Sequence, residues 1–269
     1  MTSTPSGDGA PSGVDTTVAH SARVWNYWLG GKDNYPVDRE AGEYVMQAYP
    51  EIVQAARADR AFLVRAVTHL VREEGVRQFL DVGTGLPTHH NTHEVAQAVA
   101  PEAKVVYVDN DPMVLAHARA LLTGTDEGET RYIDADLREP EKVLEAARGL
   151  LDFERPIGLT ILGTMGHFAD IQEAQDIVGR YLDALPSGSF FALCDGTSTS
   201  EGMIVAAERW NETAALPYHL RTPAEIAGFF DGLELLDPGV VSATRWRPEP
   251  AEVGEVRDAD QYCGLARKP

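Results

Sequence analysis

A short segment with two glycines, residues 79–87, constrains this chain more than any other. It reads Phe79-Leu80-Asp81-Val82-Gly83-Thr84-Gly85-Leu86-Pro87. An apolar run that ends in an acid and then turns through two glycines is typical of a buried strand leading into a nucleotide-binding loop, because glycine lets the backbone turn sharply and approach a ligand. A dinucleotide pattern needs a third glycine at position 88, where this chain has Thr88. The segment therefore favours a loop around S-adenosylmethionine over a loop around a pyrophosphate.

Two later apolar runs also end in acids. The run at residues 104–108 leads into Asp109 and Asn110, and the interval after the glycine loop leaves room for one crossover helix and a return strand. A third run, within residues 131–137, ends in Asp136 and Leu137. Because the carboxyl ends of parallel strands meet at one edge of a sheet, we expect the acids that end these runs to form one constellation.

Each position in this constellation suits one part of a nucleoside cofactor. Asp109, with Asn110 beside it, is expected to accept hydrogen bonds from the ribose hydroxyls. Asp136 is expected to accept a bond from an adenine amino group, and the Leu137 amide to donate to a ring nitrogen. Helix capping or turn formation explains any one of these acids singly. Their order along the chain favours the cofactor site.

Strand-like and helix-like segments alternate through the rest of the chain, which predicts a parallel sheet covered by helices on both faces. We expect a Rossmann-like α/β fold with a seven-stranded, mostly parallel sheet and an antiparallel C-terminal edge strand. The expected strands are 77–82, 104–108, 130–133, 157–162, 189–194, 233–236 and 260–266. The expected helices are 90–100, 112–122, 140–150, 171–184, 201–215 and 223–230.

The N-terminal part of the chain is expected to be helical. One helix ends at Gly30-Gly31, a second begins near Asp38 and ends by Pro50, and a long amphipathic helix spans residues 52–74. Three regions follow from this pattern: a disordered tail at 1–17, rich in Ser, Thr, Gly and Pro, an N-terminal helical cap at 18–76, and a cofactor-binding domain at 77–269.

Charge and composition exclude several classes of partner. The formal net charge is −19, without a strong basic patch, so neither nucleic acid nor an anionic membrane surface is an expected partner. No apolar stretch approaches the length needed to cross a bilayer. Two cysteines, Cys194 and Cys263, form no disulfide framework, and we expect buried, unpaired thiols close together on neighbouring strands in a cytoplasmic protein. The oligomeric state stays open.

These residues resemble class I S-adenosylmethionine-dependent methyltransferases, and more narrowly the S-adenosyl methyltransferase family that was first catalogued as a domain of unknown function. The general methyltransferase pattern has a third glycine at position 87, where this chain has Pro87. The more specific motif is Leu29-Gly30-Gly31-Lys32-Asp33-Asn34-Tyr35. The other matching segments are 22–27, 79–87, 91–94, 107–112, 134–138 and 264–268.

The resemblance implies S-adenosyl-L-methionine as the cofactor. It places Asp81, Gly83 and Gly85, with Thr84 between the glycines, around the methionine part, Asp109 at the ribose and Asp136 at the adenine. It implies no particular acceptor. We expect the acceptor to be a small molecule, and its reacting atom to be oxygen, nitrogen or carbon.

The N-terminal motif suggests further contacts with the cofactor. Lys32 and Asn34 follow a double glycine, so they are candidates to swing toward the cofactor carboxylate, with Tyr35 beside them. The aromatic residues nearby suit a cation, because aromatic faces attract positive charge. They equally suit a role in joining the helical cap to the sheet. These aromatic residues are Trp25, Tyr27, Trp28 and Tyr35.

The tip of the fourth expected strand, residues 163–168, is the expected place for the chemistry. Gly163 begins it as a cofactor contact, and His167 is the candidate general base, since histidine exchanges a proton near neutral pH. A base is needed only if the acceptor arrives protonated. A loop histidine without catalytic function is the stronger alternative for His167. Asp195, Arg221 and Thr222 are candidates to line the acceptor pocket, or simply cap local structure.

Three histidines follow the glycine loop, at positions 89, 90 and 93. We expect no metal there, because no cysteine or carboxylate completes a ligand spacing and a helix N-terminus repels cations. His93 and Asn91 are instead expected to organise the loop and line the pocket.

Two rival functions stay open at this point. A nicotinamide-dependent oxidoreductase would share the strand-tip acids, but the chain lacks the third glycine and a Tyr-x-x-x-Lys pair. A sensor that binds S-adenosylmethionine or S-adenosylhomocysteine without turnover would use the same cofactor site.

Overall fold

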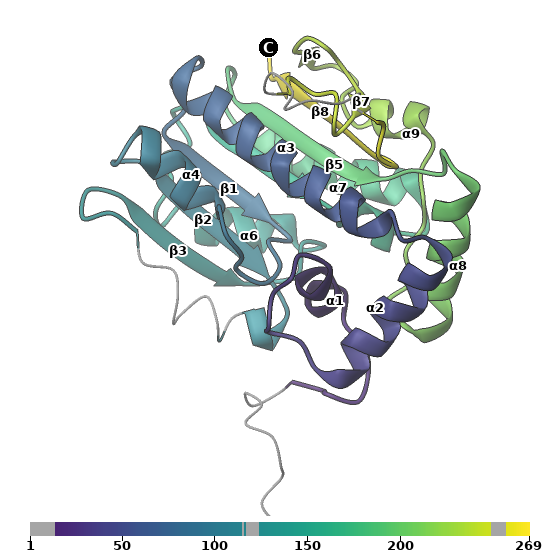
Figure 1. Cartoon of the computed structure of the whole chain (residues 1–269). Coiled ribbons are helices and arrows are strands. Elements are labelled where there is room, and N and C mark those ends of the chain that lie inside the picture. Colours follow the sequence, from purple (N-terminus) through teal and green to yellow (C-terminus); the bar gives the residue numbers. More distant parts are fainter. Residues whose placement is uncertain (1–13, 115, 117–123, 249–256) are drawn as a thin grey trace, which may run out of the picture.

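The computed structural model of the chain describes residues 14–114, 116, 124–248 and 257–269 (Figure 1). The helices are α1 (Ser21–Trp28), α2 (Pro36–Ala48), α3 (Ile52–Arg72), α4 (Thr92–Val99), α6 (Pro140–Ala147), α7 (Ile171–Ala184), α8 (Glu201–Thr213), α9 (Pro223–Gly228) and a short 3-10 helix, η1 (Met165–His167). The strands are β1 (Gln78–Val82), β2 (Lys104–Asp109), β3 (Glu129–Asp134), β4 (Gly158–Leu162), β5 (Phe190–Gly196), β6 (Glu234–Leu235), β7 (Val241–Ser242) and β8 (Gln261–Arg267).

One sheet organises the fold, in the order β3-β2-β1-β4-β5-β8-β6, with β7 also paired to β8. Strands β1 to β5 run parallel to one another, whereas β8 is antiparallel to β5, β6 and β7. The mostly parallel, Rossmann-like sheet is therefore as predicted. The chain reverses strand order at β1, where β2 and β4 lie on opposite sides. Ligands of open α/β sheets bind at such a point, beyond the carboxyl ends of the strands.

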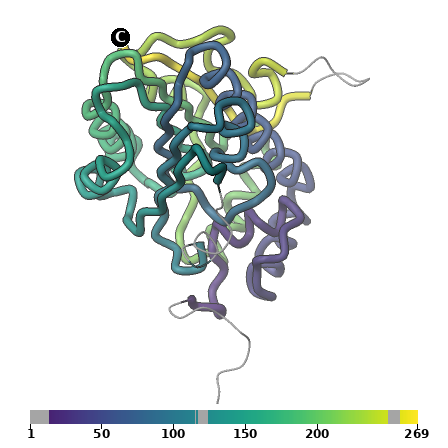
Figure 2. Tube along the Cα trace, turned by 90° about the vertical axis from the view of Figure 1, so that its left-hand side faces the viewer, coloured from purple at the N-terminus to yellow at the C-terminus, as the bar shows by residue number. Residues whose placement is uncertain are grey.

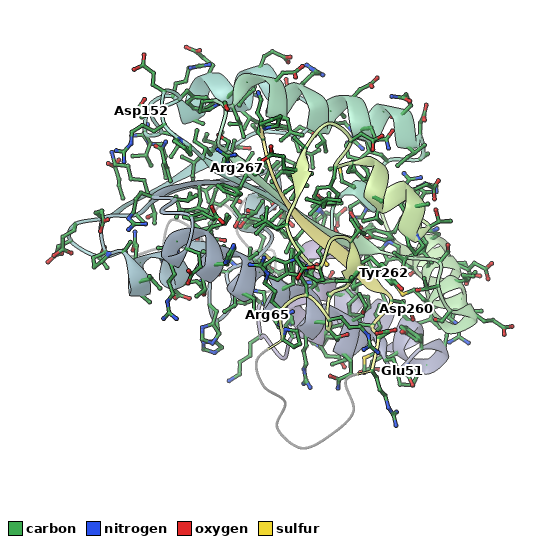
Figure 3. All side chains as sticks on the ribbon, turned by 90° about the horizontal axis from the view of Figure 1, so that it is seen from above. Glu51, Arg65, Asp152, Asp260, Tyr262 and Arg267 are labelled. Carbon is green, nitrogen blue, oxygen red and sulfur yellow. The ribbon has the colours of Figure 1, made fainter. Side chains whose placement is uncertain are left out.

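The C-terminal end of the sheet differs from the prediction in two details. The sheet has eight strands, because the two-residue β7 adds a pairing to β8. The last strand also lies inside the sheet, between β5 and β6, and the exposed β6 forms the edge. A two-residue strand has too short a pattern to be read from sequence. Viewed from above, β8 runs from Arg267 at one end to Tyr262 near the other (Figure 3).

Helices cover both faces of the sheet, as the alternation predicted. Helices α3 and α4 lie on one face, and α6 and α7 lie on the other (Figures 1 and 2). The strand pattern explains this arrangement, since successive side chains point to opposite faces. Phe79 packs with α3 and α4, whereas its neighbours Leu80 and Val82 pack with α6 and α7. The same alternation puts Asp81 on the face covered by α3.

The N-terminal helices form a separate apolar cluster with α8. Trp28, Val45 and Ile52 pack there against Met203 and Trp210. Helix α3 connects this cluster to the sheet, because its first turns belong to the cluster and its later turns cover the strands. The division into a cap at 18–76 and a domain at 77–269 stays a prediction. The predicted disordered tail lies mostly outside the described residues, and so does most of the predicted helix 112–122.

Cys194 on β5 and Cys263 on β8 lie opposite each other in the antiparallel register. Both are buried and free, which confirms the expectation of two neighbouring, unpaired thiols. Within the described residues, no helix combines the length and apolar character that crossing a membrane requires.

Candidate functional site

The loop after β1 has a left-handed backbone conformation that its glycines allow. Gly83 and Gly85 have φ angles of +73° and +66°, a region that other residues rarely adopt. A Cβ placed on Gly83 would lie 2.3 Å from Thr164 Cγ2, whereas a Cβ on Gly85 would meet no atom within 4 Å. The first glycine is therefore needed for packing against the tip of β4. The second leaves open space where a ligand can approach the backbone.

Hydrogen bonds tie this loop to the tip of β2. The amides of Gly83 and Thr84 donate to the Val108 carbonyl at 2.8 and 3.2 Å. The Gly85 amide donates to Asp109 Oδ2 at 2.8 Å. Burial raises the pKa of Asp109, although bonds from the Gly85 and Asp111 amides favour its ionised form. Asp109 is thus both a structural support of the loop and a lining residue of the space above it.

A cavity at this edge of the sheet, about 170 Å³ in volume, collects most of the predicted cofactor residues. It lies over the tips of β1, β2 and β4, under α1 and α3. The predicted residues that line it are Asp81, Gly83, Thr84, Gly85, Asp109, Asn110, Asp136, Leu137 and Gly163. The three strand-tip acids therefore share one cavity.

Asp81 and Asp136 are the first and the last of these three acids along the chain, and they differ in exposure. Asp81 is 7% exposed and accepts a hydrogen bond from Thr92 Oγ1 at 2.5 Å. Burial is the main cause of its raised pKa, and the hydroxyl of Thr92 opposes that effect. Asp136 is partly exposed, accepts the Arg138 amide at 2.9 Å and lies 3.4 Å from Asn110 Nδ2. It is therefore accessible to a ligand.

Other polar residues that the sequence did not single out as site residues line the same cavity, among them Asn26, Asp59 and Arg60. Asp59 and Arg60 lie on α3, and Asn26 lies on α1. A signal for Asp59 exists in the sequence, since it falls on the apolar face of α3 between Ala55 and Phe62, where a charge is unexpected. Burial raises the pKa of Asp59 to about 7.

The structure explains the Gly30-to-Tyr35 motif through Asn26. Its Oδ1 accepts the Asp33 amide at 3.0 Å and Asn34 Nδ2 at 2.9 Å. A Cβ on Gly31 would lie 2.3 Å from the Asn26 amide group, so glycine is required there. Lys32, Asn34 and Tyr35 are not among the described residues that line the cavity. Their role as cofactor contacts stays a prediction, while the motif visibly positions Asn26.

His167 lies on η1 and lines two cavities at once. Its Nδ1 lies 2.9 Å from the Pro217 carbonyl oxygen, which can only accept, so Nδ1 carries the proton and Nε2 holds the free lone pair. Burial lowers the pKa of His167. Its ring meets the Tyr218 ring edge-on, at 5.2 Å between centroids. A neutral histidine with a fixed tautomer is suited to act as a base.

The second cavity, about 60 Å³ in volume, lies between α1, α2 and α8 and is mostly apolar. It shares four lining residues with the first: Ser21, Trp25, Gly163 and His167. None of the described residues that line it is an Asp, Glu, Lys or Arg. The rest of its wall is Val24, Trp28, Val45, Ile52, Met203, Ala206, Ala207, Trp210, Tyr218 and Gln261.

The other acceptor candidates, Asp195, Arg221 and Thr222, do not line this cavity. Asp195 is fully buried, bonds to the Tyr218 hydroxyl and accepts the Met165 amide at 2.7 Å. Burial raises its pKa to about 7. Arg221 bonds to the Phe168 carbonyl, and Thr222 caps α9 through Glu225. Asp195 and Arg221 are not among the described residues that line either cavity, whereas Tyr218, which bonds to Asp195, lines the second.

The three histidines after the glycine loop do not cluster. His89 and His90 are exposed, whereas His93 is buried with its Nδ1 2.8 Å from the Tyr107 hydroxyl. Among the described residues, no three potential ligands lie close enough together to hold a metal ion. Asn91 organises the loop, because its side chain bonds to the amide and the carbonyl of Thr88.

Comparison with known proteins agrees with this geometry. The sequence profile of the S-adenosyl methyltransferase family matches residues 8–269. The chain belongs to the S-adenosyl methyltransferase family. Members of this family are by name S-adenosylmethionine-dependent methyltransferases, and the Rossmann-like fold described above agrees with that activity. No curated protein matches the chain.

Two solved structures are close relatives of this family member. A DUF574 family protein from Streptomyces avermitilis MA-4680 is 45% identical, with a TM-score of 0.91 over 95% of this chain and 99% of that one. A candidate methyltransferase from Thermobifida fusca YX is 38% identical, with a TM-score of 0.87 over 96% and 97%. The plantazolicin methyltransferase BamL, solved with S-adenosylhomocysteine, is 9% identical with a TM-score of 0.53, which shows a shared fold.

The residues of the first cavity fit the cofactor that the family name implies. Gly85 leaves open space beside the backbone, and Asp109 and Asp136 line that space from adjacent strand tips. Cavity residues also carry buried polar atoms without a hydrogen-bond partner in the described part of the chain, namely Asp59 Oδ1, Arg60 Nε and Thr164 Oγ1. Since buried polar atoms are normally satisfied, these atoms suit a ligand with polar groups of its own.

Proposed function

We propose that this chain transfers a methyl group from S-adenosylmethionine to a small, neutral, mostly apolar acceptor. The observation that carries this proposal is the shared wall of the two cavities. The first cavity is polar and acidic, and suits the cofactor. The second is apolar and suits an acceptor, and Gly163 and His167 belong to both. An acceptor in the second cavity would meet the cofactor site at this wall.

When bound, S-adenosylmethionine supplies a methyl group that its sulfonium has already activated. The protein then contributes mainly by holding the acceptor in line with that group and by excluding water. The apolar walls of α1 and α8, with Trp25 and Trp210, provide such a surface. His167 Nε2 is the nitrogen available to take a proton from the acceptor, because Nδ1 is already bound to Pro217.

The lining of the second cavity restricts the acceptor class. A charged group entering an apolar site loses hydration that only an opposite charge can replace. The described lining offers no charged side chain and His167 is held neutral, so a carboxylate, phosphate or ammonium would gain no partner there. A neutral molecule with a ring and one hydroxyl suits this lining, because the ring can pack against the tryptophans and the hydroxyl can bond to His167.

The electrostatics of the first cavity disfavour a nicotinamide cofactor. Four carboxylates line it, from Asp59, Asp81, Asp109 and Asp136, against two guanidinium groups, from Arg60 and Arg138. Arg138 lies 3.6 Å from Asp136, which leaves little positive charge for a pyrophosphate. A cofactor with a sulfonium and an ammonium suits this excess of acid better. A binding protein without turnover would have no use for the second cavity, which favours an enzyme.

A screen of paired acceptors tests the acceptor class. Purified protein would be incubated with S-adenosylmethionine and neutral phenols or cyclic alcohols, each beside its carboxylate or ammonium counterpart, and mass spectrometry would detect added methyl groups. We expect methylation within the neutral set, and its loss in His167→Gln. Methylation confined to the charged members would contradict the proposed acceptor class. Cofactor binding without any methylation would favour the sensor.

A further inference from the structure

Asp59 is a buried acid on the wall of the first cavity, and the Cys194 thiol is its hydrogen-bonding neighbour on the protein side. It lies on α3, is 5% exposed, and its Oδ1 has no hydrogen-bond partner within the described residues. Burying a carboxylate oxygen that accepts no hydrogen bond is unfavourable. An alanine at this position, like Ala55 and Ala56 before it, would pack on α3 without that penalty. The position therefore suits a ligand that supplies the missing partner.

Arg60, the next residue, carries the complementary charge on the same wall. Its Nη2 lies 3.2 Å from both the His90 carbonyl and Asn91 Oδ1, so the loop before α4 holds the guanidinium in place. Its Nε is buried and also lacks a hydrogen-bond partner in the described part of the chain. An anionic group would satisfy this nitrogen, and a guanidinium suits a carboxylate in particular.

The position of the pair selects one end of the cavity. Asp136 and Asp109 belong to the tips of β3 and β2, on one side of the sheet order. Asp59 lies toward the other side, since it interacts with Cys194 on β5 and with Asp81 on β1. A nucleoside held by the β2 and β3 acids would therefore extend its far end toward Asp59 and Arg60. That end of the cavity has a buried carboxylate, Asp59, and a guanidinium held in place, Arg60, at adjacent positions of α3.

We propose that Asp59 and Arg60 bind the amino-acid end of the cofactor. Asp59 would bind the ammonium group of the cofactor, and Arg60 would bind its carboxylate group. This inference rests on the proposed function, because it assumes an S-adenosyl ligand in the first cavity. The local charge balance supports it. The carboxylates of Asp59 and Asp81 face the single guanidinium of Arg60 among the described lining residues at this end. One cation is needed for neutrality, and a zwitterionic amino acid beside a sulfonium supplies it.

Three ligands that differ only at this end test the assignment by calorimetric titration. S-adenosylhomocysteine has both charged groups, its decarboxylated form retains only the amine, and methylthioadenosine has neither. We expect Asp59→Asn to weaken the binding of the first two ligands by about 10- to 100-fold, the effect of one hydrogen bond to a charged group. The affinity for methylthioadenosine should stay unchanged. We expect Arg60→Gln to weaken the binding of S-adenosylhomocysteine alone, by a similar factor.

A matched control separates this effect from a general change in α3. Arg57→Gln removes an exposed arginine from the same helix, about one turn earlier, and should change none of the three affinities. Thermal unfolding of each variant shows whether it has folded. Asp59→Asn replaces an acid by an amide of the same shape, so we expect it to fold.

The outcomes distinguish this inference from the proposed function. An equal loss of affinity for all three ligands in Asp59→Asn would overturn the inference, since the residue would then act only on the shape of the cavity. Wild-type protein that binds methylthioadenosine as tightly as S-adenosylhomocysteine would also overturn it, while the cofactor assignment would stand. Wild-type protein that binds none of the three would contradict the proposed function itself.

Discussion

The Gly85 amide donates a hydrogen bond to Asp109 Oδ2 at 2.8 Å, so the acid at the tip of β2 fixes the loop that follows β1. The other oxygen, Oδ1, accepts the Asp111 amide at 3.0 Å. A carboxylate oxygen accepts more than one hydrogen bond, and Asp109 can hold the loop and still accept ligand hydroxyls. One residue thus links the shape of the loop to the expected contact with the ribose.

Replacing Asp109 by Asn should weaken the binding of S-adenosylhomocysteine and of methylthioadenosine by the same factor. An amide offers one acceptor oxygen, and its NH₂ group would face a backbone donor that the carboxylate now accepts. We expect a loss of about 10- to 100-fold for both ligands, because both carry the ribose. Calorimetric titration measures it. Asp134→Asn, at an exposed position on the neighbouring strand, is the control and should bind both ligands normally.

Gly83 and Gly85 should respond differently to alanine. Both have positive φ angles, which disfavours alanine by about 1–2 kcal/mol. Only at Gly83 does the new Cβ also meet Thr164 Cγ2, at 2.3 Å. We expect thermal unfolding to show a larger loss of stability for Gly83→Ala than for Gly85→Ala. Thr164→Ser removes Cγ2, so adding it to Gly83→Ala should recover part of the difference. Equal losses without recovery would contradict the packing explanation.

Asp59→Asn should stabilise the unliganded protein, increasingly so as pH rises. Burial raises the pKa of Asp59 to about 7, opposed by Cys194 and Arg60 and assisted by Asp81. The folded protein therefore holds a proton between about pH 4 and 7 that the unfolded chain releases. The stability linked to this proton is complete below about pH 4 and is lost as pH rises through 7, on the order of 4 kcal/mol in total.

Chemical unfolding of both proteins from pH 5 to 8 measures this difference. Asparagine does not titrate, and the other buried acids are common to both proteins, so the advantage of Asp59→Asn should grow across this range. A difference that stays constant with pH would mean that Asp59 does not titrate there.

His167→Gln should reduce turnover without changing cofactor affinity. If Nε2 takes the acceptor proton, we expect kcat to fall by about 10²- to 10⁴-fold, the usual contribution of a general base. Burial lowers the pKa of His167, so the rate of the wild-type enzyme should decline only below the ordinary histidine range near pH 6.5. A pH–rate profile with the methylated product as readout measures both effects. An unchanged kcat in the variant would assign His167 to the cavity wall alone.

The strand-tip acids and glycines were predictable because each lies where a local pattern ends. Asp81, Asp109 and Asp136 follow apolar runs, and parallel strands bring such ends to one edge. The sequence therefore predicted which residues line the first cavity at that edge. The Gly30-to-Tyr35 motif was also visible, but its contact with Asn26 depends on a turn whose geometry the sequence alone does not determine.

The contribution of α3 and of the second cavity was not predictable in the same way. Asp59 and Arg60 reach the site only because α3 crosses the sheet edge, which no local pattern specifies. Tyr218 meets His167 across a long interval of sequence, after a loop without a motif. The short strand β7, and the position of β8 inside the sheet, likewise depend on packing between distant segments.

Direct titration of the wild-type protein with S-adenosylmethionine, S-adenosylhomocysteine and NAD, each by calorimetry at pH 7.5, tests the central claim most directly. We expect micromolar binding of the first two ligands and no binding of NAD, with both affinities reduced in Asp109→Asn. Binding of NAD alone, or of none of the three, would contradict it and would leave the strand-tip acids as structural caps.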